Sequence, residues 1–120
     1  MSRVLICGGR DFADKRLMMA TLDTAAALHG EASCVIEGGA NGADRIGRQW
    51  ARWKKLPVLT VDADWDGYGK AAGGIRNQWM IDHGKPDYVV AFPTSQSIGT
   101  HDMIRRAEKA GLPVVTATSS

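Results

Sequence analysis

Five short apolar runs recur along the chain, separated by stretches with helical spacing. The runs are continuous rather than alternating with polar residues, and they cover residues 3–7, 33–37, 57–61, 87–92 and 113–116. Continuous runs of this kind are typical of strands that are buried on both faces of a parallel sheet. The pattern therefore predicts five parallel strands.

Between the runs, apolar residues recur every three or four positions, which is the spacing of one face of a helix. This spacing predicts four helices, around residues 17–25, 46–53, 75–79 and 103–110. Asp14 stands where a residue caps the first helix, and Gly111 and Pro113 follow the last one. Strands and helices that alternate in this way predict a doubly wound α/β fold, with residues 1–120 as a single Rossmann-like domain.

Two features fall outside the simple alternation. Trp50, Trp53 and Trp79 occur at core spacing, so we expect them to pack in the interior. Residues 62–73 follow neither period, and their alternating aspartates lack the glycine and the distal glutamate of a calcium loop. We expect this segment to be a solvated loop that covers the carboxyl edge of the sheet.

Composition narrows the class of protein. A chain of 120 residues can bury one core without a metal or a disulfide. The net charge of +2 gives no reason to expect a nucleic-acid partner, which usually requires a strong basic stripe. No apolar stretch approaches the roughly 20 residues of a membrane span, and no signal peptide precedes the first run. We therefore expect a cytoplasmic protein in which Cys7 and Cys34 are reduced core thiols rather than a bridge or a metal site.

Glycine pairs follow two of the predicted strands, at residues 8–9 and 38–39, and Gly99 and Thr100 open the last helix. Ligands of open parallel sheets bind outside the carboxyl ends of the strands. Glycine lets a phosphate approach the backbone closely, and the free N–H groups of a helix N-terminus attract an anion. The pattern predicts a phosphate site; the alternative is that these glycines only build tight turns.

Side chains at the same edge extend this prediction. Arg10 follows the first glycine pair, and Arg76 with Asn77 is expected to open the third helix. A guanidinium group matches phosphate with two parallel hydrogen bonds, although both arginines could instead be solvent-exposed. Phe12 is the candidate for stacking on a base. The three histidines are far apart and show neither a nucleophile nor a metal spacing, so we predict no catalytic histidine and no metal.

Four motifs in order, at residues 8–12, 37–44, 74–77 and 99–100, resemble those of the SLOG superfamily, and most closely its YspA-like branch. The superfamily includes the LOG ("lonely guy") phosphoribohydrolases and the DNA-processing protein DprA. The resemblance implies a Rossmann-like fold with strand order 3-2-1-4-5, a crevice between the first and fourth strands, and a nucleotide or nucleotide-derived ligand. It also implies a homodimer or higher homo-oligomer, for which the many tryptophans would supply apolar surface.

One departure from the LOG pattern concerns catalysis. Met103 stands where the LOG signature has its catalytic glutamate, and Asp102 is one position away. Hydrolysis of a glycosidic bond usually needs a carboxylate to handle protons. The leading hypothesis is therefore a binding protein that senses or sequesters a nucleotide or an ADP-ribose-derived molecule, including as a phage-encoded sponge of an immune signal. The alternatives are a hydrolase that uses Asp44, Asp64 or Asp102, and a DprA-like nucleic-acid module.

The predicted partner is thus a nucleotide-like small molecule, with no cofactor, no metal and no catalytic residue assigned. The predicted ligand-binding residues are Gly8, Gly9, Arg10, Asp11, Phe12, Gly38, Gly39, Asn41, Gly42, Asp44, Lys70, Arg76, Asn77, Pro93, Thr94, Gly99 and Thr100.

Overall fold

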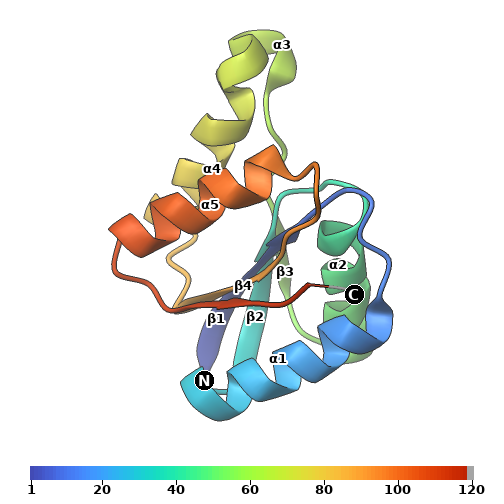
Figure 1. The fold of residues 1–120 in the computed structure, drawn as a ribbon. Coiled ribbons are helices and arrows are strands. Elements are labelled where there is room, and N and C mark those ends of the chain that lie inside the picture. The colour runs from blue at the N-terminus through green and yellow to red at the C-terminus, as the bar shows by residue number, and fades with distance from the viewer. Residues whose placement is uncertain (119–120) are drawn as a thin grey trace.

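The computed structural model describes residues 1–118 and contains one five-stranded sheet (Figure 1). Its strands are β1 (Ser2–Gly8), β2 (Ala32–Glu37), β3 (Val58–Thr60), β4 (Tyr88–Phe92) and β5 (Val114–Thr116). All neighbouring strands pair in parallel, in the order β3-β2-β1-β4-β5. The predicted α/β fold and the predicted strand order are both confirmed. Because the order reverses at β1, the loops after β1 and β4 diverge and leave room for a ligand between them.

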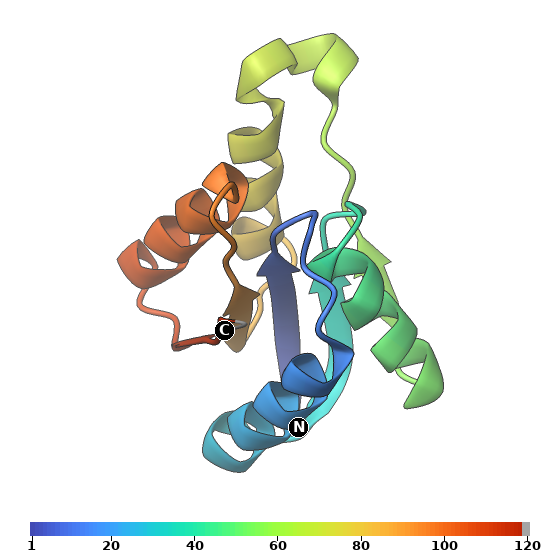
Figure 2. The same cartoon turned by 45° about the vertical axis from the view of Figure 1, so that its right-hand side comes forward.

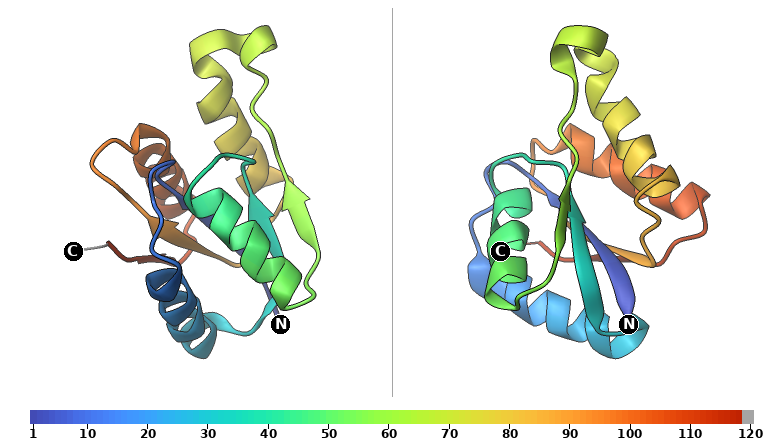
Figure 3. Two further views of the ribbon diagram at one scale, coloured as in Figure 1. Left: turned by 90° about the vertical axis from the view of Figure 1, so that its right-hand side faces the viewer. Right: turned by 180° about the vertical axis from the view of Figure 1, so that it is seen from behind.

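The helices are α1 (Lys15–His29), α2 (Ala43–Trp53), α3 (Trp65–Tyr68), the 3₁₀ turn η1 (Gly69–Ala71), α4 (Ala72–Asp82) and α5 (Ile98–Lys109). Helices α1 and α2 cover one face of the sheet, and α4 and α5 cover the other (Figures 2 and 3). Asp14 caps α1 as expected, since its carboxylate accepts a hydrogen bond of 3.0 Å from the N–H of Leu17.

The core has two halves, one on each face of the sheet. Successive residues of β1 point to opposite faces, so Val4 and Ile6 pack under α1 and α2 while Leu5 and Cys7 pack under α4 and α5. Cys7 and Cys34 are both buried free thiols, as predicted. Met103 lies in the second half, in contact with neither solvent nor ligand space. The position that the resemblance matches to the LOG catalytic glutamate is therefore buried in the core.

The tryptophan prediction was only partly right. Trp50 packs against the core as expected, but Trp53 and Trp79 are 67% and 43% exposed. Helical spacing assigned both to the interior, yet the small residues Gly47 and Ala51 face the sheet from α2. Trp53 instead lies on the surface, where the ammonium group of Lys54 stands 5.4 Å from its ring centroid.

The prediction for residues 62–73 was right in part. Most of the segment is solvent-exposed and residues 62–64 are a loop, as expected. Residues 65–73 instead form α3, η1 and the start of α4, and α3 and η1 project away from the sheet rather than covering its edge (Figures 1 and 3). Asp64 caps α3 by accepting a hydrogen bond of 2.9 Å from the N–H of Gly67. We call residues 65–71 the arm.

Candidate functional site

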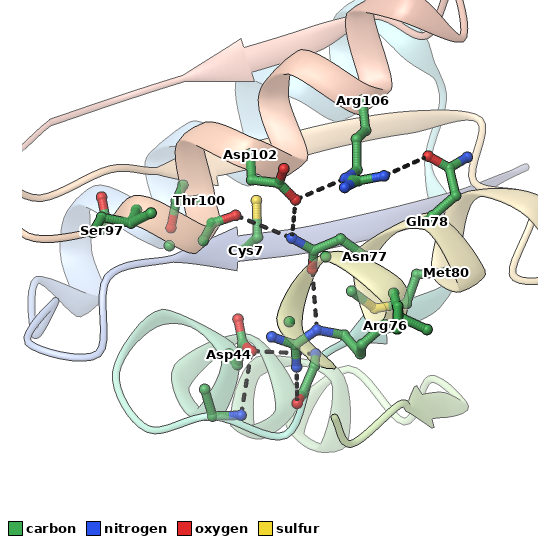
Figure 4. A pocket seen from close by; sticks show the side chains of 18 of the residues that line it. Cys7, Asp44, Arg76, Asn77, Gln78, Met80, Ser97, Thr100, Asp102 and Arg106 are labelled. Atoms are coloured by element: carbon green, nitrogen blue, oxygen red, sulfur yellow. Dashed lines mark hydrogen bonds and ion pairs between the residues drawn. The ribbon is translucent and has the colours of Figure 1, made fainter. Parts of the chain in front are cut away.

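A cleft of about 1180 Å³ opens at the carboxyl ends of the strands. The loops after β1 and β2 line it together with most of α4, and Figure 4 shows Asp44 and the α4 residues Arg76 and Asn77 among the lining side chains. The start of α5 and part of the arm complete the lining. The cleft therefore occupies the place where open parallel sheets bind their ligands.

The two glycine loops pack backbone against backbone. Gly42 has a φ of +72°, and a Cβ at this position would lie 2.2 Å from the carbonyl oxygen of Gly9. The N–H of Ala43 donates a hydrogen bond of 3.2 Å to the same oxygen. A Cβ on Gly8 would lie 2.5 Å from the Cβ of Ala43. Packing alone thus requires glycine at these positions, whether or not a ligand also approaches them.

Asp44 stabilises the second glycine loop by hydrogen bonds to its backbone. The side chain is buried, and its Oδ2 accepts hydrogen bonds from the N–H groups of Gly38 at 3.2 Å and of Ala40 at 3.3 Å. Burial raises the pKa of Asp44 to about 6, and the hydrogen bonds offset this only in part. The site therefore contains a carboxyl group that changes charge near neutral pH.

Glu37 anchors the same loop one residue before it begins, and the sequence assigned it no role. It is fully buried at the end of β2, where it accepts hydrogen bonds from Arg48 Nη1 and from the N–H of Gly39, both at 2.8 Å. The hydroxyl of Thr60 in β3 also donates to it. A carboxylate at the end of a buried strand needs a charged or hydrogen-bonding partner. The position of Glu37 in an apolar run was therefore the sequence signal that it has a structural role.

Arg76 joins the two sides of the cleft. Its Nη1 donates a hydrogen bond of 2.6 Å to the carbonyl oxygen of Gly38, and its Nε donates one of 3.0 Å to Oδ1 of Asn77 (Figure 4). No residue of the described chain accepts a hydrogen bond from its Nη2. The expected place at a helix start is wrong, because α4 already begins at Ala72 and Arg76 lies in its second turn. Arg76 therefore offers a ligand only the N–H groups of its guanidinium, and the backbone N–H groups at the start of α4 are not next to it.

Asn77 continues this network towards α5. The side chain is buried, and its Nδ2 donates to the carbonyl oxygen of Gly99 at 3.1 Å and to Oδ2 of Asp102 at 3.0 Å. Arg106 donates to the same Asp102 oxygen at 2.8 Å. Burial raises the pKa of Asp102, but the hydrogen bonds from Arg106 and Asn77 outweigh it and hold the pKa below its ordinary value. Asp102 is therefore an ionised, paired carboxylate.

Two helix N-termini with free N–H groups border the cleft, which Asp44 of α2 and Ile98 and Gly99 of α5 line. In α2, the first bond of the helical pattern comes from the N–H of Ile46, and the N–H groups of Asp44 and Arg45 have no partner in the described chain. In α5, the first helical hydrogen bonds are donated by the N–H groups of Thr100 and His101. The N–H groups of Ile98 and Gly99 have no partner in the described chain. Both ends carry the partial positive charge of a helix N-terminus.

The sequence model of the YspA, cpYpsA-related SLOG family matches residues 2–68, which contain both glycine loops. This chain belongs to that family. The gene 61 protein of Mycobacterium phage D29 is 38% identical over 120 residues, which cover 96% of this chain and 95% of that protein. SLOG membership and a phage relative together suggest a nucleotide-related function. The predicted resemblance is thus confirmed.

The cleft of this SLOG protein brings together most of the predicted ligand-binding residues. Those that line it are Gly8, Gly9, Arg10, Asp11, Gly38, Asp44, Lys70, Arg76, Asn77, Gly99 and Thr100. The others do not line it, and they are Phe12, Gly39, Asn41, Gly42, Pro93 and Thr94. Of these, Phe12, Pro93 and Thr94 line a separate, smaller cavity together with Asp11. Thr94 supports the first loop, because its hydroxyl donates a hydrogen bond of 2.7 Å to Oδ1 of Asp11.

Phe12 was wrongly placed as a base-stacking residue. It is 4% exposed and packs against Phe92, with ring centroids 4.9 Å apart. The motif showed an aromatic residue next to a glycine loop but could not show that its ring turns inward. Asp64 likewise does not line the cleft, since it caps α3 in the arm.

The structure adds cleft residues that the sequence did not single out, among them Cys7, Trp65 and Arg106. Burial raises the pKa of the Cys7 thiol far above its ordinary value, so this sulfur is uncharged. Within residues 1–118, no cluster of three or more His, Cys, Asp or Glu side chains is arranged to hold a metal ion. In the same part of the chain, no helix combines the length and apolar character needed to cross a membrane.

Proposed function

We propose that this SLOG protein binds a nucleotide or an ADP-ribose-derived molecule in the cleft, with the phosphates against the glycine loops. The observation that carries the proposal is the convergence of unpaired donors on one cleft. These donors are Nη2 of Arg76 and the free N–H groups at the starts of α2 and α5. Helix N-termini and a guanidinium group together favour a multiply charged phosphate ligand.

The role that we propose is to sense or to sequester this ligand rather than to consume it. Met103 replaces the LOG catalytic glutamate and is buried in the core, and Asp102 is held ionised between Asn77 and Arg106. The phage relative favours sequestration of a host immune signal, and the host cytoplasm is where such a sponge would act.

One observation favours hydrolysis as a second candidate. Asp44 lines the cleft, and its pKa of about 6 suits a group that gives up a proton near neutral pH. Such a carboxyl group could protonate the leaving group of an N-glycosidic or phosphate ester bond. In that case Asp44→Asn would bind the ligand but form no product.

A titration panel separates these functions. Isothermal titration of the purified protein with AMP, ADP, NAD, ADP-ribose and cyclic ADP-ribose measures binding, and mass spectrometry of each mixture detects products. Binding of at least one compound, recovered unchanged, supports sequestration or sensing. A product that Asp44→Asn does not form supports the hydrolase. A panel that gives neither heat nor product contradicts both.

We also propose that the chain forms a homodimer. The exposed side chains of Trp53, Ile75 and Trp79 supply apolar surface that the monomer leaves in water. Twofold pairing is the commonest arrangement of homo-oligomers. Light scattering should give twice the mass of the 12.9 kDa chain, and a monomer mass at working concentration contradicts the proposal.

A further inference from the structure

Trp65 is an exposed aromatic residue that the fold does not need. It is 49% exposed and belongs to neither half of the hydrophobic core, yet it lines the cleft. One edge of its indole rests on the first turn of α4, because its Cη2 lies 3.4 Å from the position of a Cβ built on Gly73. The ring is thus held from one side while half of its surface stays open to solvent.

The helix that supports this ring also carries Arg76. Gly73 shares one face of α4 with Arg76 and Asn77, at spacings of three and four residues. The helical rise separates Gly73 from Arg76 by about 4.5 Å along the axis, and the guanidinium reaches farther, to Gly38. The exposed indole of Trp65 and the guanidinium of Arg76 therefore line the same cleft, supported by the same helix.

The other aromatic residues nearby fit this position less well. Trp79 also borders the cleft, but it lies with Ile75 on a different face of α4, and one side of its ring is covered by His83 at 5.0 Å. Tyr68 is on the same short helix as Trp65 and is 56% exposed, but it does not line the cleft. Tyr68 is therefore a natural control for Trp65.

We infer that Trp65 is the platform on which the base of the ligand stacks, so that the ligand class is a nucleoside phosphate rather than a sugar phosphate without a base. This inference rests on the proposed function, since it assumes that the phosphates bind at the glycine loops. Base–aromatic stacking is sequence-tolerant and lowers Kd by about 5- to 100-fold per base. Lys70 follows Trp65 along the arm and also lines the cleft, so its ammonium group adds a hydrogen-bond donor for a ligand hydroxyl or phosphate.

The test compares a probe that has a base with one that does not. ADP and pyrophosphate are titrated into the wild type, Trp65→Ala, Trp65→Phe and Tyr68→Ala, and thermal unfolding checks that each variant is folded. Trp65→Ala should bind ADP about 5- to 100-fold more weakly and pyrophosphate as tightly as the wild type. Trp65→Phe should recover most of the ADP affinity, and Tyr68→Ala should change neither affinity.

Three results would overturn the inference while leaving the proposed function in place. The first is a Trp65→Ala variant that binds ADP as the wild type does. The second is a wild type that binds ADP no more tightly than pyrophosphate. The third is an equal loss of affinity for both probes together with a lower mass in light scattering, which would make Trp65 a contact to a second copy. A wild type that binds neither probe would overturn this inference. The proposed function would fall with it only if no other compound of the titration panel binds either.

Discussion

On one side of the cleft, Glu37 and Asp44 are almost wholly buried and tie the second glycine loop to the sheet. On the other side, no residue of α3 or η1 is buried, and the arm projects from the body of the protein (Figure 1). We refer to the loops after β1 and β2, residues 8–11 and 37–44, as the loop wall. The loop wall is continuous with the core, so its residues should affect stability and binding together. The arm contributes little to the core, so its residues should affect ligand preference alone.

The largest expected effect on the loop wall is that of Glu37→Ala. The substitution leaves Arg48 and the N–H of Gly39 without their buried partner. Breaking a buried ion pair in this way costs about 3–5 kcal/mol of unfolding free energy. Urea denaturation measures this loss. The control is Glu108→Ala at an exposed position of α5, where a change within about 0.5 kcal/mol is expected. A similar small change for Glu37→Ala would refute the account of the loop wall.

Gly42→Ala should have the next largest effect. The new Cβ would meet the carbonyl oxygen of Gly9 in a backbone conformation with a φ of +72°. Strain and displacement of the first loop should cost about 2–4 kcal/mol of unfolding free energy and should weaken nucleotide binding as well. Gly99→Ala is the matched control, because a Cβ there meets nothing within 4 Å. If both variants are equally stable, the loops do not pack as described.

Asp44 makes the loop wall sensitive to pH. Its pKa is raised from an ordinary value near 4 to about 6, so the folded state holds this proton more tightly than the unfolded state does. The stability that this proton contributes, at most about 3 kcal/mol, is fully present below pH 4 and is lost as the pH rises through 6.

Asp44→Asn, which cannot ionise, isolates this contribution from those of other groups. Unfolding free energies of the wild type and the variant, measured between pH 4 and pH 7, should differ by an amount that changes with pH in this window. Asp102→Asn, measured from pH 4 down to pH 2, should show the opposite trend, because the lowered pKa of Asp102 stabilises the fold above its ordinary pKa and the benefit is lost as the pH falls below that value. Parallel curves for the wild type and Asp44→Asn would show that the pKa of Asp44 is not raised.

The arm should give the smallest effect on stability. Replacing both Trp65 and Tyr68 by alanine removes two exposed rings that contact neither half of the core. The unfolding free energy should change by no more than about 0.5 kcal/mol in urea denaturation. A loss above 2 kcal/mol would mean that the arm is part of the folding unit and that the contrast between the two sides does not hold.

The same contrast explains what could be predicted from the sequence. The apolar runs predicted the strands because the three central strands, β1, β2 and β4, are buried on both faces and the edge strands β3 and β5 are partly buried. The glycine pairs predicted the loop wall because they follow β1 and β2 directly. The strand order came from the SLOG resemblance, since alternation alone does not fix it. Glu37 was detectable in principle, because a charge within a buried run needs a partner.

The arm and the inner residues of the site could not be predicted in this way. Arg76 and Asn77 were expected to open the third helix, but α4 begins at Ala72, with Gly73 and Gly74 inside its first turn, so Arg76 was placed one turn too early. Periodicity failed for Trp53 and Trp79, and the position of Phe12 after the first glycine loop did not show where its ring points, because the direction of a ring depends on contacts between elements that are far apart in the sequence. The positions of these side chains depend on tertiary packing, which the sequence pattern does not show.

The most direct test of the central claim, phosphate binding in the cleft, is the affinity of Arg76 variants for ADP. Arg76→Ala should weaken binding about 10- to 100-fold, because it removes a charge-assisted contact of about 1.5–3 kcal/mol. Arg76→Lys should not restore the affinity, since an ammonium group cannot replace both Nη1 on Gly38 and Nη2 on the ligand. Arg52→Ala removes the same charge from an exposed position of α2 outside the cleft and should bind as the wild type does. Wild-type affinity in Arg76→Ala would contradict the account.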